Sequence, residues 1–149
     1  MANDPAIIDE IRARYRENSV LPHPDEVAVS EREGTVTLRG TVSGLHDRRV
    51  AADIAKSVPA VRSVENDLSI DPLDHWQEHV IRGAALQALI WSDDVPDDHI
   101  DASVSAAWVT LKGEVRHQTE SDAAFEAVIG LPGAGGITNE IKVVAPTGR

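Results

Sequence analysis

The chain has 149 residues, of which 42% are hydrophobic and 26% charged, values ordinary for a soluble globular protein. Its 25 acidic and 14 basic side chains give a net charge of −11, which would repel a phosphate backbone and argues against nucleic-acid binding. The sequence contains no cysteine, which excludes disulfides, thiolate metal sites and thiol nucleophiles.

The N-terminal residues do not have the basic and apolar regions of a signal peptide. No stretch approaches the roughly 18 consecutive apolar residues that a membrane-spanning helix needs. From these two observations we expect a cytoplasmic location.

One seven-residue segment occurs twice. Val-Thr-Leu-Arg-Gly-Thr-Val at 36–42 returns as Val-Thr-Leu-Lys-Gly-Glu-Val at 109–115, an offset of 73 residues (109 − 36). The offset holds without a gap on both sides, and it pairs Asn66 with Asn139. The sequence therefore predicts two related units, residues 1–73 and 74–149, each near the lower size limit for an adequate core.

The first copy begins with a helix, because Asp4-Pro5 is a typical helix start and apolar residues follow at helical spacing up to Tyr15. Period-two alternation on either side of Glu33-Gly34 then predicts a hairpin. A second helix, from about 45 to 57, and a third strand, at 61–70, complete this copy. The second copy repeats the order with a helix at 74–91, a hairpin at 100–115, a helix at 119–131 and a strand at 137–143.

Each copy therefore has the order α-β-β-α-β. Because a strand–helix–strand connection is right-handed and joins parallel strands, the third strand should lie parallel to the second. We predict an α+β fold of two tandem units, each a small three-stranded mixed sheet with two helices on one face and a bare opposite face. Gly40 and Gly113 lie on the apolar face of their strands, where we expect a helix backbone to approach closely.

A hairpin ends in Val-x-Leu-x-Gly-x-Val at 36–42, and Val-Pro-x-Val-x-x-Val-x-Asn-x-Leu follows an alanine-rich helix at 58–68. These two motifs resemble those of the BON domain, a family known from bacterial osmotic-stress-induced and nodulation-related proteins. The second copy departs more, with Leu-Pro-Gly-Ala-Gly-Gly-Ile-Thr-Asn-Glu-Ile at 131–141. The resemblance implies an α-β-β-α-β fold, no enzyme activity, and a role in contacting phospholipid membranes or partner proteins. Members of the family are frequently exported.

The segment His75-Trp76-Gln77-Glu78-His79 fits H-x-x-E-H, in which inverted zinc peptidases hold a metal with two histidines beside a glutamate base. No third ligand is evident in a unit this small, so we expect a solvated helical turn with no catalytic role, no metal and no cofactor. A weak zinc or nickel site is the alternative.

Two further features receive structural interpretations. The acidic segment 93–101 lacks the spacing and central glycine of a calcium-binding EF-hand loop, which favours a hydrated connection over a cation site. Asn66 and Asn139 are in phase with the apolar residues of the last strands, and we expect their amides to fasten the preceding loop through backbone hydrogen bonds.

The helix at 74–91 has a second apolar side, formed by Leu86, Leu89 and Ile90, that an isolated unit would leave in water. We expect these residues to form a contact between the two copies or between chains. Trp108 lies on the strand face that should be bare. It is either a weaker part of the same interaction surface or a residue that the neighbouring copy covers.

The leading hypothesis is a non-enzymatic interaction module in a stress-related setting. It would bind a protein partner, a second copy of itself or a phospholipid membrane surface, and no nucleic acid. The alternative is a small-ligand or metal-ion sensor that uses the acidic loop and the histidines. A third hypothesis is a hydrolase built on His75, Glu78 and His79.

Overall fold

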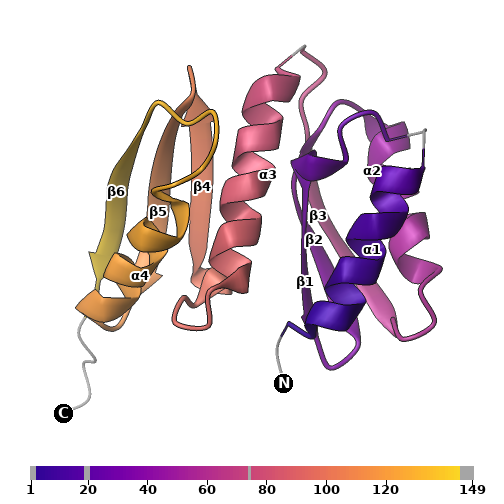
Figure 1. Ribbon diagram of the computed structural model, residues 1–149, viewed down its shortest axis with the longest axis horizontal. Helices are drawn as coiled ribbons and strands as arrows, with labels where there is room; N and C mark the ends of the chain where they lie inside the picture. Colours follow the sequence, from indigo (N-terminus) through magenta and orange to yellow (C-terminus); the bar gives the residue numbers. More distant parts are fainter. Residues whose placement is uncertain (1–2, 19–20, 74, 145–149) are drawn as a thin grey trace.

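The computed structural model describes residues 3–18, 21–73 and 75–144 (Figure 1). The first unit contains α1 (Pro5–Glu17), the 3-10 turn η1 (Pro24–Glu26), β1 (Val27–Arg32), β2 (Thr35–Val42), α2 (Leu45–Lys56) and β3 (Ser63–Ile70). The second contains α3 (Trp76–Trp91), the 3-10 turn η2 (Asp97–His99), β4 (Ile100–Ser105), β5 (Trp108–Val115), α4 (Gln118–Val128) and β6 (Gly136–Val143).

The two units have the same sheet topology and register. Their strand orders are β1-β2-β3 and β4-β5-β6, with the first pair antiparallel and the second parallel in each sheet. Val27 pairs with Gly40 as Ile100 pairs with Gly113, so the 73-residue offset of the sequence is also the offset of the strand pairing. The predicted α+β fold of two repeated units, each with a three-stranded mixed sheet, is confirmed.

Local signals explain how the first unit assembles. The side chain of Asp4 accepts a hydrogen bond from the backbone N–H of Ala6 at 2.9 Å, and Pro5 occupies the first helical position, as the sequence predicts. Helices α1 and α2 cover one face of the sheet, where Tyr15 is fully buried and donates its hydroxyl hydrogen to the carbonyl of Ala51 at 2.9 Å. The apolar residues of both helices and of the inner strand faces form one core.

The close approach at Gly40 and Gly113 has a different cause from the expected one. A Cβ at Gly40 would lie 2.1 Å from the carbonyl oxygen of Glu26, and a Cβ at Gly113 would lie 2.2 Å from that of His99. The approaching backbone therefore belongs to η1 or η2, and the expectation of a neighbouring α-helix is wrong. Both glycines also have positive φ values, 131° and 148°, which other residues rarely adopt.

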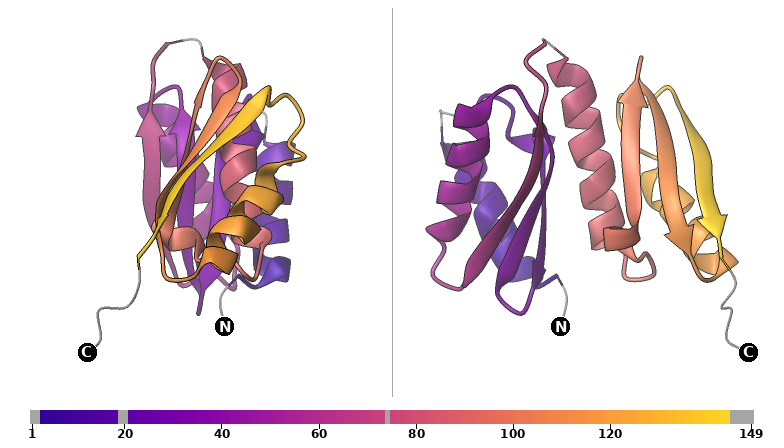
Figure 2. Two further views of the ribbon diagram at one scale, coloured as in Figure 1. Left: turned by 90° about the vertical axis from the view of Figure 1, so that its left-hand side faces the viewer. Right: turned by 180° about the vertical axis from the view of Figure 1, so that it is seen from behind.

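Helix α3 lies between the two sheets (Figures 1 and 2). One of its sides packs with β4 and α4 in the second unit, and the other packs on η1, β1 and β2 of the first. The outer face of the first sheet is therefore covered over β1 and β2, which corrects the expectation that this face would be bare. At 16 residues α3 is too short to cross a bilayer, and no other helix in the described part of the chain has the length and apolarity to do so.

Candidate functional site

The junction between the units is formed by α3. Leu86, Leu89 and Ile90 are 0%, 0% and 1% exposed, and they share a buried cluster with Ala28 of β1 and Ile100 of β4. These three side chains lie inside the molecule, where the two units meet. The sequence singles them out by their helical spacing and apolarity.

Helix α3 approaches the backbone of the first unit closely at Gly83. A Cβ at this position would lie 2.2 Å from the carbonyl oxygen of Asp25 and 2.7 Å from the carbonyl carbon of Glu26. Sequence reasoning missed this residue, although a glycine inside a helix costs about 1 kcal/mol relative to alanine and thereby signals a packing role.

Gln87 binds the edge of the first sheet. Its amide oxygen accepts a hydrogen bond from the backbone N–H of Val29 at 2.8 Å, and its amide nitrogen donates to the carbonyl of Val29 at 3.0 Å. The same oxygen accepts a hydrogen bond from Arg12 of α1 at 2.6 Å. Because β1 is an edge strand, Gln87 satisfies backbone groups that would otherwise be free to pair with another strand.

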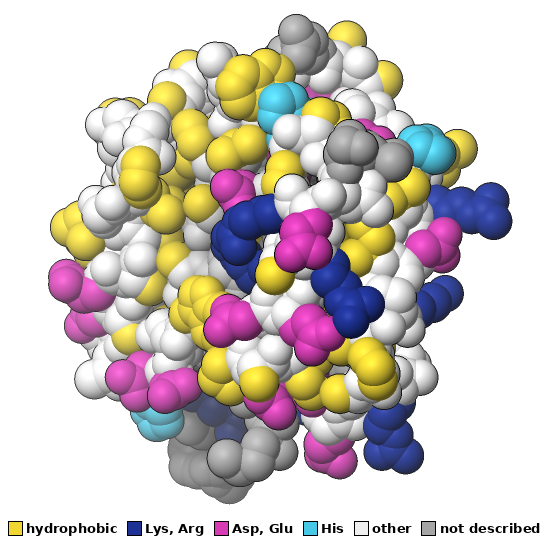
Figure 3. Space-filling model, turned by 45° about the vertical axis from the view of Figure 1, so that its right-hand side comes forward, with side chains coloured by type: hydrophobic (Ala, Val, Ile, Leu, Met, Phe, Trp, Pro, Cys, Tyr) yellow, Lys and Arg dark blue, Asp and Glu magenta, His cyan; other side chains and the backbone are white. Residues whose placement is uncertain are grey.

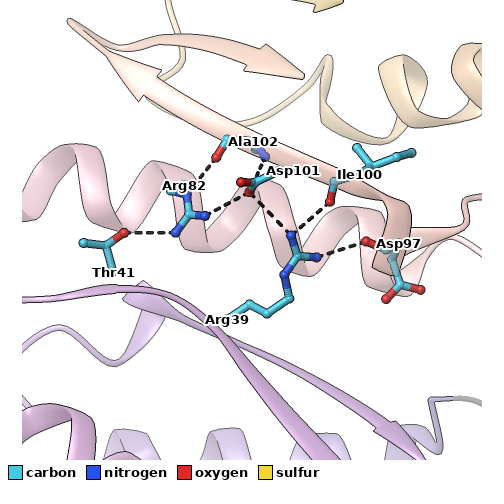
Figure 4. Close-up of polar contacts among 7 residues, drawn as sticks. All are labelled: Arg39, Thr41, Arg82, Asp97, Ile100, Asp101 and Ala102. Atoms are coloured by element: carbon cyan, nitrogen blue, oxygen red, sulfur yellow. Dashed lines mark hydrogen bonds and ion pairs between the residues drawn. The ribbon is translucent and has the colours of Figure 1, made fainter. Parts of the chain in front are cut away.

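Two arginines and one aspartate connect the units in addition (Figure 4). Arg39 of β2 and Arg82 of α3 both contact the carboxylate of Asp101, at 3.4 and 2.9 Å. Arg39 also donates to the carbonyls of Asp97 and Ile100, both at 3.0 Å, and Arg82 to the carbonyl of Ala102 at 2.7 Å and the hydroxyl of Thr41 at 3.0 Å. The arginine side chains are only 19% exposed, which places them within the junction.

The acidic segment 93–101 takes part in this junction. The side chain of Asp98 lies 3.9 Å from that of Arg32 in β1, and Asp97 is only 8% exposed. Burial, followed by the charge of Asp98, raises the pKa of Asp97 above its ordinary value. The expectation of a hydrated loop therefore holds for the exposed residues Asp93 and Asp94 but is wrong for Asp97.

Asp71, His75 and His79 form a cluster where β3 connects to α3. Asp71 Oδ2 lies 3.0 Å from His75 Nδ1 and 3.0 Å from His79 Nε2, and one ligand atom from each residue falls within 4.8 Å of the other two. The expectation that no third ligand would lie near the two histidines is wrong, because Asp71, four residues before His75, supplies one. Hydrogen bonds from His79, from the backbone N–H of Leu73 and from His75 lower the pKa of Asp71 to about 2.

The glutamate of the H-x-x-E-H motif lies apart from this cluster. Glu78 accepts a hydrogen bond from the backbone N–H of Ala106, in the turn between β4 and β5, at 2.7 Å. The two histidines therefore share their site with Asp71 and not with the glutamate that the peptidase pattern would use as a base.

His79 is buried against the first unit. It is 6% exposed, and its Nδ1 atom lies 3.5 Å from the carboxylate oxygen Oε2 of Glu26 and has no hydrogen-bond partner among the residues that the structure describes. Glu26 is itself 5% exposed, and burial, with a smaller contribution from the charge of Asp47, raises its pKa to about 7. On the neighbouring turn of α3 the ring of Trp76 stacks on His23 at a centroid distance of 4.4 Å.

Trp108 lies on the outer face of the second sheet, the face opposite α3 and α4. Its side chain is 49% exposed, so the first unit does not cover it. The indole N–H donates to the hydroxyl of Thr138 at 2.7 Å, and the ring lies against Gly136, where a Cβ would be 2.4 Å from it. The tryptophan is therefore held flat on the sheet.

Comparison with known proteins shows to which domain family the repeated unit belongs. The family model described as "BON domain" matches residues 3–72 and again 77–145. The chain belongs to the BON domain family. Osmotically-inducible protein Y of Escherichia coli (strain K12) is 26% identical over 149 residues, an alignment that covers 94% of this chain and 72% of that protein.

Solved structures similar to this tandem BON protein include CdsD, a structural protein of the type III secretion system of Chlamydia trachomatis. CdsD is 12% identical with a TM-score of 0.42, over 95% of this chain and 94% of that one. The C-terminal domain of CdsD is 11% identical with a TM-score of 0.39, over 95% and 99%. Both are too distant to add to the assignment.

The asparagine of the BON motif contacts the equivalent residue of the preceding helix in both units. The Nδ2 group of Asn66 donates to the carbonyl of Arg48 at 2.9 Å, and that of Asn139 to the hydroxyl of Ser121 at 3.0 Å. Arg48 and Ser121 are themselves 73 residues apart. Each amide therefore fastens the last strand to the preceding helix, α2 or α4, where the sequence predicted a loop.

Proposed function

We propose that this tandem BON protein is a stress-related, non-enzymatic interaction module, and that the outer face of its second sheet binds a protein partner. One observation carries the proposal: α3 covers the equivalent face of the first sheet, whereas Trp108 on the second is 49% exposed. The stress-related setting is supported by the similarity to an osmotically inducible protein. Neither that relative nor the family is known as an enzyme.

The chemistry of the face suits a protein partner. On β5 and β6 it consists of the side chains of Trp108, Thr110, Lys112, Glu114, Thr138, Glu140 and Lys142, and β4 adds Asp101, Ser103 and Ser105. The two lysines and two glutamates of β5 and β6 cancel in charge, and Lys112 lies 3.9 Å from Glu140. The carboxylate of Asp101 on β4 is paired with Arg82 at 2.9 Å. A half-exposed tryptophan at the edge of a neutral polar surface is typical of an interface anchor.

The partner is expected to be a protein of different sequence and not a second copy. If copies stacked head to tail, α1 of one chain would have to pack on this face as α3 packs on the first sheet. The residues of α1 that correspond to Gly83, Gln87 and Ile90 are Glu10, Arg14 and Glu17. Because Glu10 and Arg14 are exposed or half-exposed and pair with each other at 2.7 Å, α1 presents a hydrated charged surface instead.

A phospholipid surface is the less favoured partner. Peripheral binding to anionic lipid depends on clustered basic side chains, and this chain carries a net charge of −11. On the face drawn in Figure 3, basic side chains lie beside acidic ones. The balanced charges around Trp108 have the same character.

The proposal is tested by placing a photo-crosslinking amino acid at position 108 in living cells, with position 91 as the matched control. Trp91 is also a partly exposed tryptophan, at 40%, but it lies at the end of α3. We expect a discrete adduct with one identified protein from position 108 and none from position 91. The adduct should be lost when Thr110, on the same face, is replaced by Arg.

Three outcomes would contradict the proposal. Equal adducts from positions 108 and 91 would show that the face is not specific. An adduct of twice the chain mass would make the partner a second copy. Flotation of the purified protein with anionic phospholipid vesicles, abolished by Trp108→Ala, would assign the face to a membrane.

A further inference from the structure

We infer that Asp71, His75 and His79 form a binding site for a divalent transition-metal ion, best matched by zinc, at the joint between the two BON units. The site is separate from the proposed docking face, since it lies where β3 connects to α3. The inference does not depend on that face having a partner.

The geometry of the donors fits a metal ion. A tetrahedral zinc ion with bonds of about 2.0–2.2 Å holds its ligand atoms about 3.3–3.6 Å apart. Asp71 Oδ2 lies 3.0 Å from a ring nitrogen of each histidine, and one ligand atom from each residue lies within 4.8 Å of the other two. The side chains of Asp71 and His75 are 29% and 49% exposed, so small rotations can bring the three atoms to equal distances from an ion. The exposed side leaves a fourth position for water.

The orphaned nitrogen of His79 is the second observation that points to a metal. When His79 donates its Nε2 hydrogen to Asp71, its Nδ1 atom has no partner in the described part of the chain, although the side chain is only 7% exposed. Buried polar atoms are rarely left unpaired. Coordination of a metal through Nε2 requires the opposite tautomer, in which Nδ1 carries the hydrogen and faces Glu26 Oε2, 3.5 Å away. Metal binding would therefore pair the orphaned atom.

Glu26 then acts as the orienting carboxylate of a carboxylate–histidine–metal arrangement. Such outer partners fix the tautomer and the ring orientation of a ligating histidine. Glu26 is suited to this because η1 holds it, 5% exposed, on the first-unit side of the junction. An ion at this site would thus be connected to both units: to the first through Asp71, and to the second through His75 and His79 at the start of α3, with Glu26 of the first unit orienting His79.

The donor set favours zinc over the hard cations. Calcium and magnesium take mostly oxygen ligands, whereas two imidazoles and one carboxylate suit zinc and its transition-metal neighbours. Three protein ligands and a water also occur in catalytic zinc sites. The base that the sequence motif would supply, Glu78, instead contacts Ala106 in the β4–β5 turn. The ion would therefore have a structural role, holding the first turn of α3 against the end of β3.

The test is calorimetric titration of zinc chloride into the untagged full-length chain after treatment with a chelator. We expect one saturable site per chain and a higher melting temperature with zinc. His75→Ala and Asp71→Asn should each weaken binding by at least about 100-fold, because each removes a ligand and not only an outer partner, whose loss costs about 10–100-fold. His99→Ala is the matched control: His99 is 66% exposed and lies 3.8 Å from a single carboxylate, that of Asp98, and its loss should leave the affinity unchanged.

Glu26→Gln and cobalt provide a second readout. The variant should keep the stoichiometry of one and bind zinc about 10–100-fold more weakly. Cobalt bound to the wild-type chain should give the intense visible absorption of a four-coordinate ion, and His75→Ala should abolish it. The inference is overturned if the wild-type chain binds no zinc at saturation, or if His75→Ala binds as tightly as the wild type. It is equally overturned if His99→Ala loses the site.

Discussion

Helices α1 and α3 occupy the same place in the two BON units, yet only α3 connects two sheets. Each packs its inner side on its own sheet and partner helix. The outward side of α1 carries Glu10 and Arg14, which pair with each other near solvent. At the matching positions α3 has Gly83, which approaches the backbone of η1, and Gln87, which binds the backbone of Val29.

The comparison shows that the repeat preserves the unit, while a few outward residues decide how units associate. The joint is not only an apolar contact, because a glycine sets the distance between α3 and the first unit and a glutamine satisfies the sheet edge. The sheets differ in the same way. Arg39 in the first is 19% exposed and binds the second unit, while its counterpart Lys112 is 67% exposed.

The largest effect is expected where the two units are identical. Gly40→Val and Gly113→Val should each lower the free energy of unfolding by about 3–5 kcal/mol, because a side chain would meet the carbonyl of Glu26 or His99 and would also require a strained backbone. The measurement is urea denaturation of both variants. Gly130→Val is the control, since a Cβ there meets no atom of the described residues within 4 Å, and it should change stability by less than about 0.5 kcal/mol. Markedly different costs at Gly40 and Gly113 would contradict the equivalence of the units.

The second largest effect on stability is expected in α3 and not at the matching position of α1. Gln87→Leu removes the partner of both backbone groups of Val29 and of Arg12, so we expect a loss of about 2–4 kcal/mol. Faster hydrogen exchange at the Val29 amide should accompany it. Arg14, at the matching position of α1, has a side chain that is 38% exposed, and its contacts with Glu10 and Ser57 lie near solvent, so Arg14→Leu should stay within about 0.5 kcal/mol of the wild type. If the Val29 amide of the Gln87→Leu variant exchanged its hydrogen as slowly as in the wild type, Gln87 would not be the group that protects the backbone of the edge strand β1.

How far the sequence predicts this molecule depends on the range of the interaction. The strand register follows from the repeat. Val27 pairs with Gly40 and Ile100 pairs with Gly113, and both pairings follow from the 73-residue offset and from the alternation of apolar and polar residues along the strands. The apolar side of α3 is equally visible as Leu86, Leu89 and Ile90. The surface against which this side packs cannot be predicted, because the helical spacing of apolar residues does not indicate which sheet face they contact.

The polar parts of the junction and of the metal cluster were harder to predict for a related reason. Asp71 could have been found as a residue one helical turn before His75, but it precedes the helix and its direction depends on the connection from β3. Glu26 lies 53 residues from His79 (79 − 26), and only the docking of the two units brings them together. Long-range polar contacts leave no periodic signal.

A smaller effect is expected at the glycine that sets the interunit distance. Gly83→Ala would stabilise an isolated helix by about 1 kcal/mol. Here we expect a net destabilisation of about 1–3 kcal/mol, because the new Cβ would lie 2.2 Å from a backbone oxygen of η1 that cannot rotate away. Glu10→Ala, the matching change in α1, should be within about 0.5 kcal/mol of the wild type by the same thermal-melting measurement. A stabilised Gly83→Ala variant would mean that the units are not held this closely.

The smallest effect concerns the charged contacts. Asp101 is 61% exposed, so its ion pairs with Arg39 and Arg82 are screened by solvent, and Asp101→Asn should cost only about 0.5–1 kcal/mol. The cost should shrink in about 1 M salt, where the Debye length falls to roughly 3 Å. Asp98→Asn serves as the control, since Asp98 is similarly exposed but lies 3.9 Å from the single arginine Arg32, and it should cost less at either salt concentration. A loss at Asp101 that persists in high salt would assign its contribution to the hydrogen bonds shown in Figure 4 and not to its charge. The contact through Asp101 would then depend on hydrogen-bond geometry, as the contact of Gln87 with Val29 does. The outward side of α1, with Glu10 and Arg14, makes no such contact with a second sheet in the described residues.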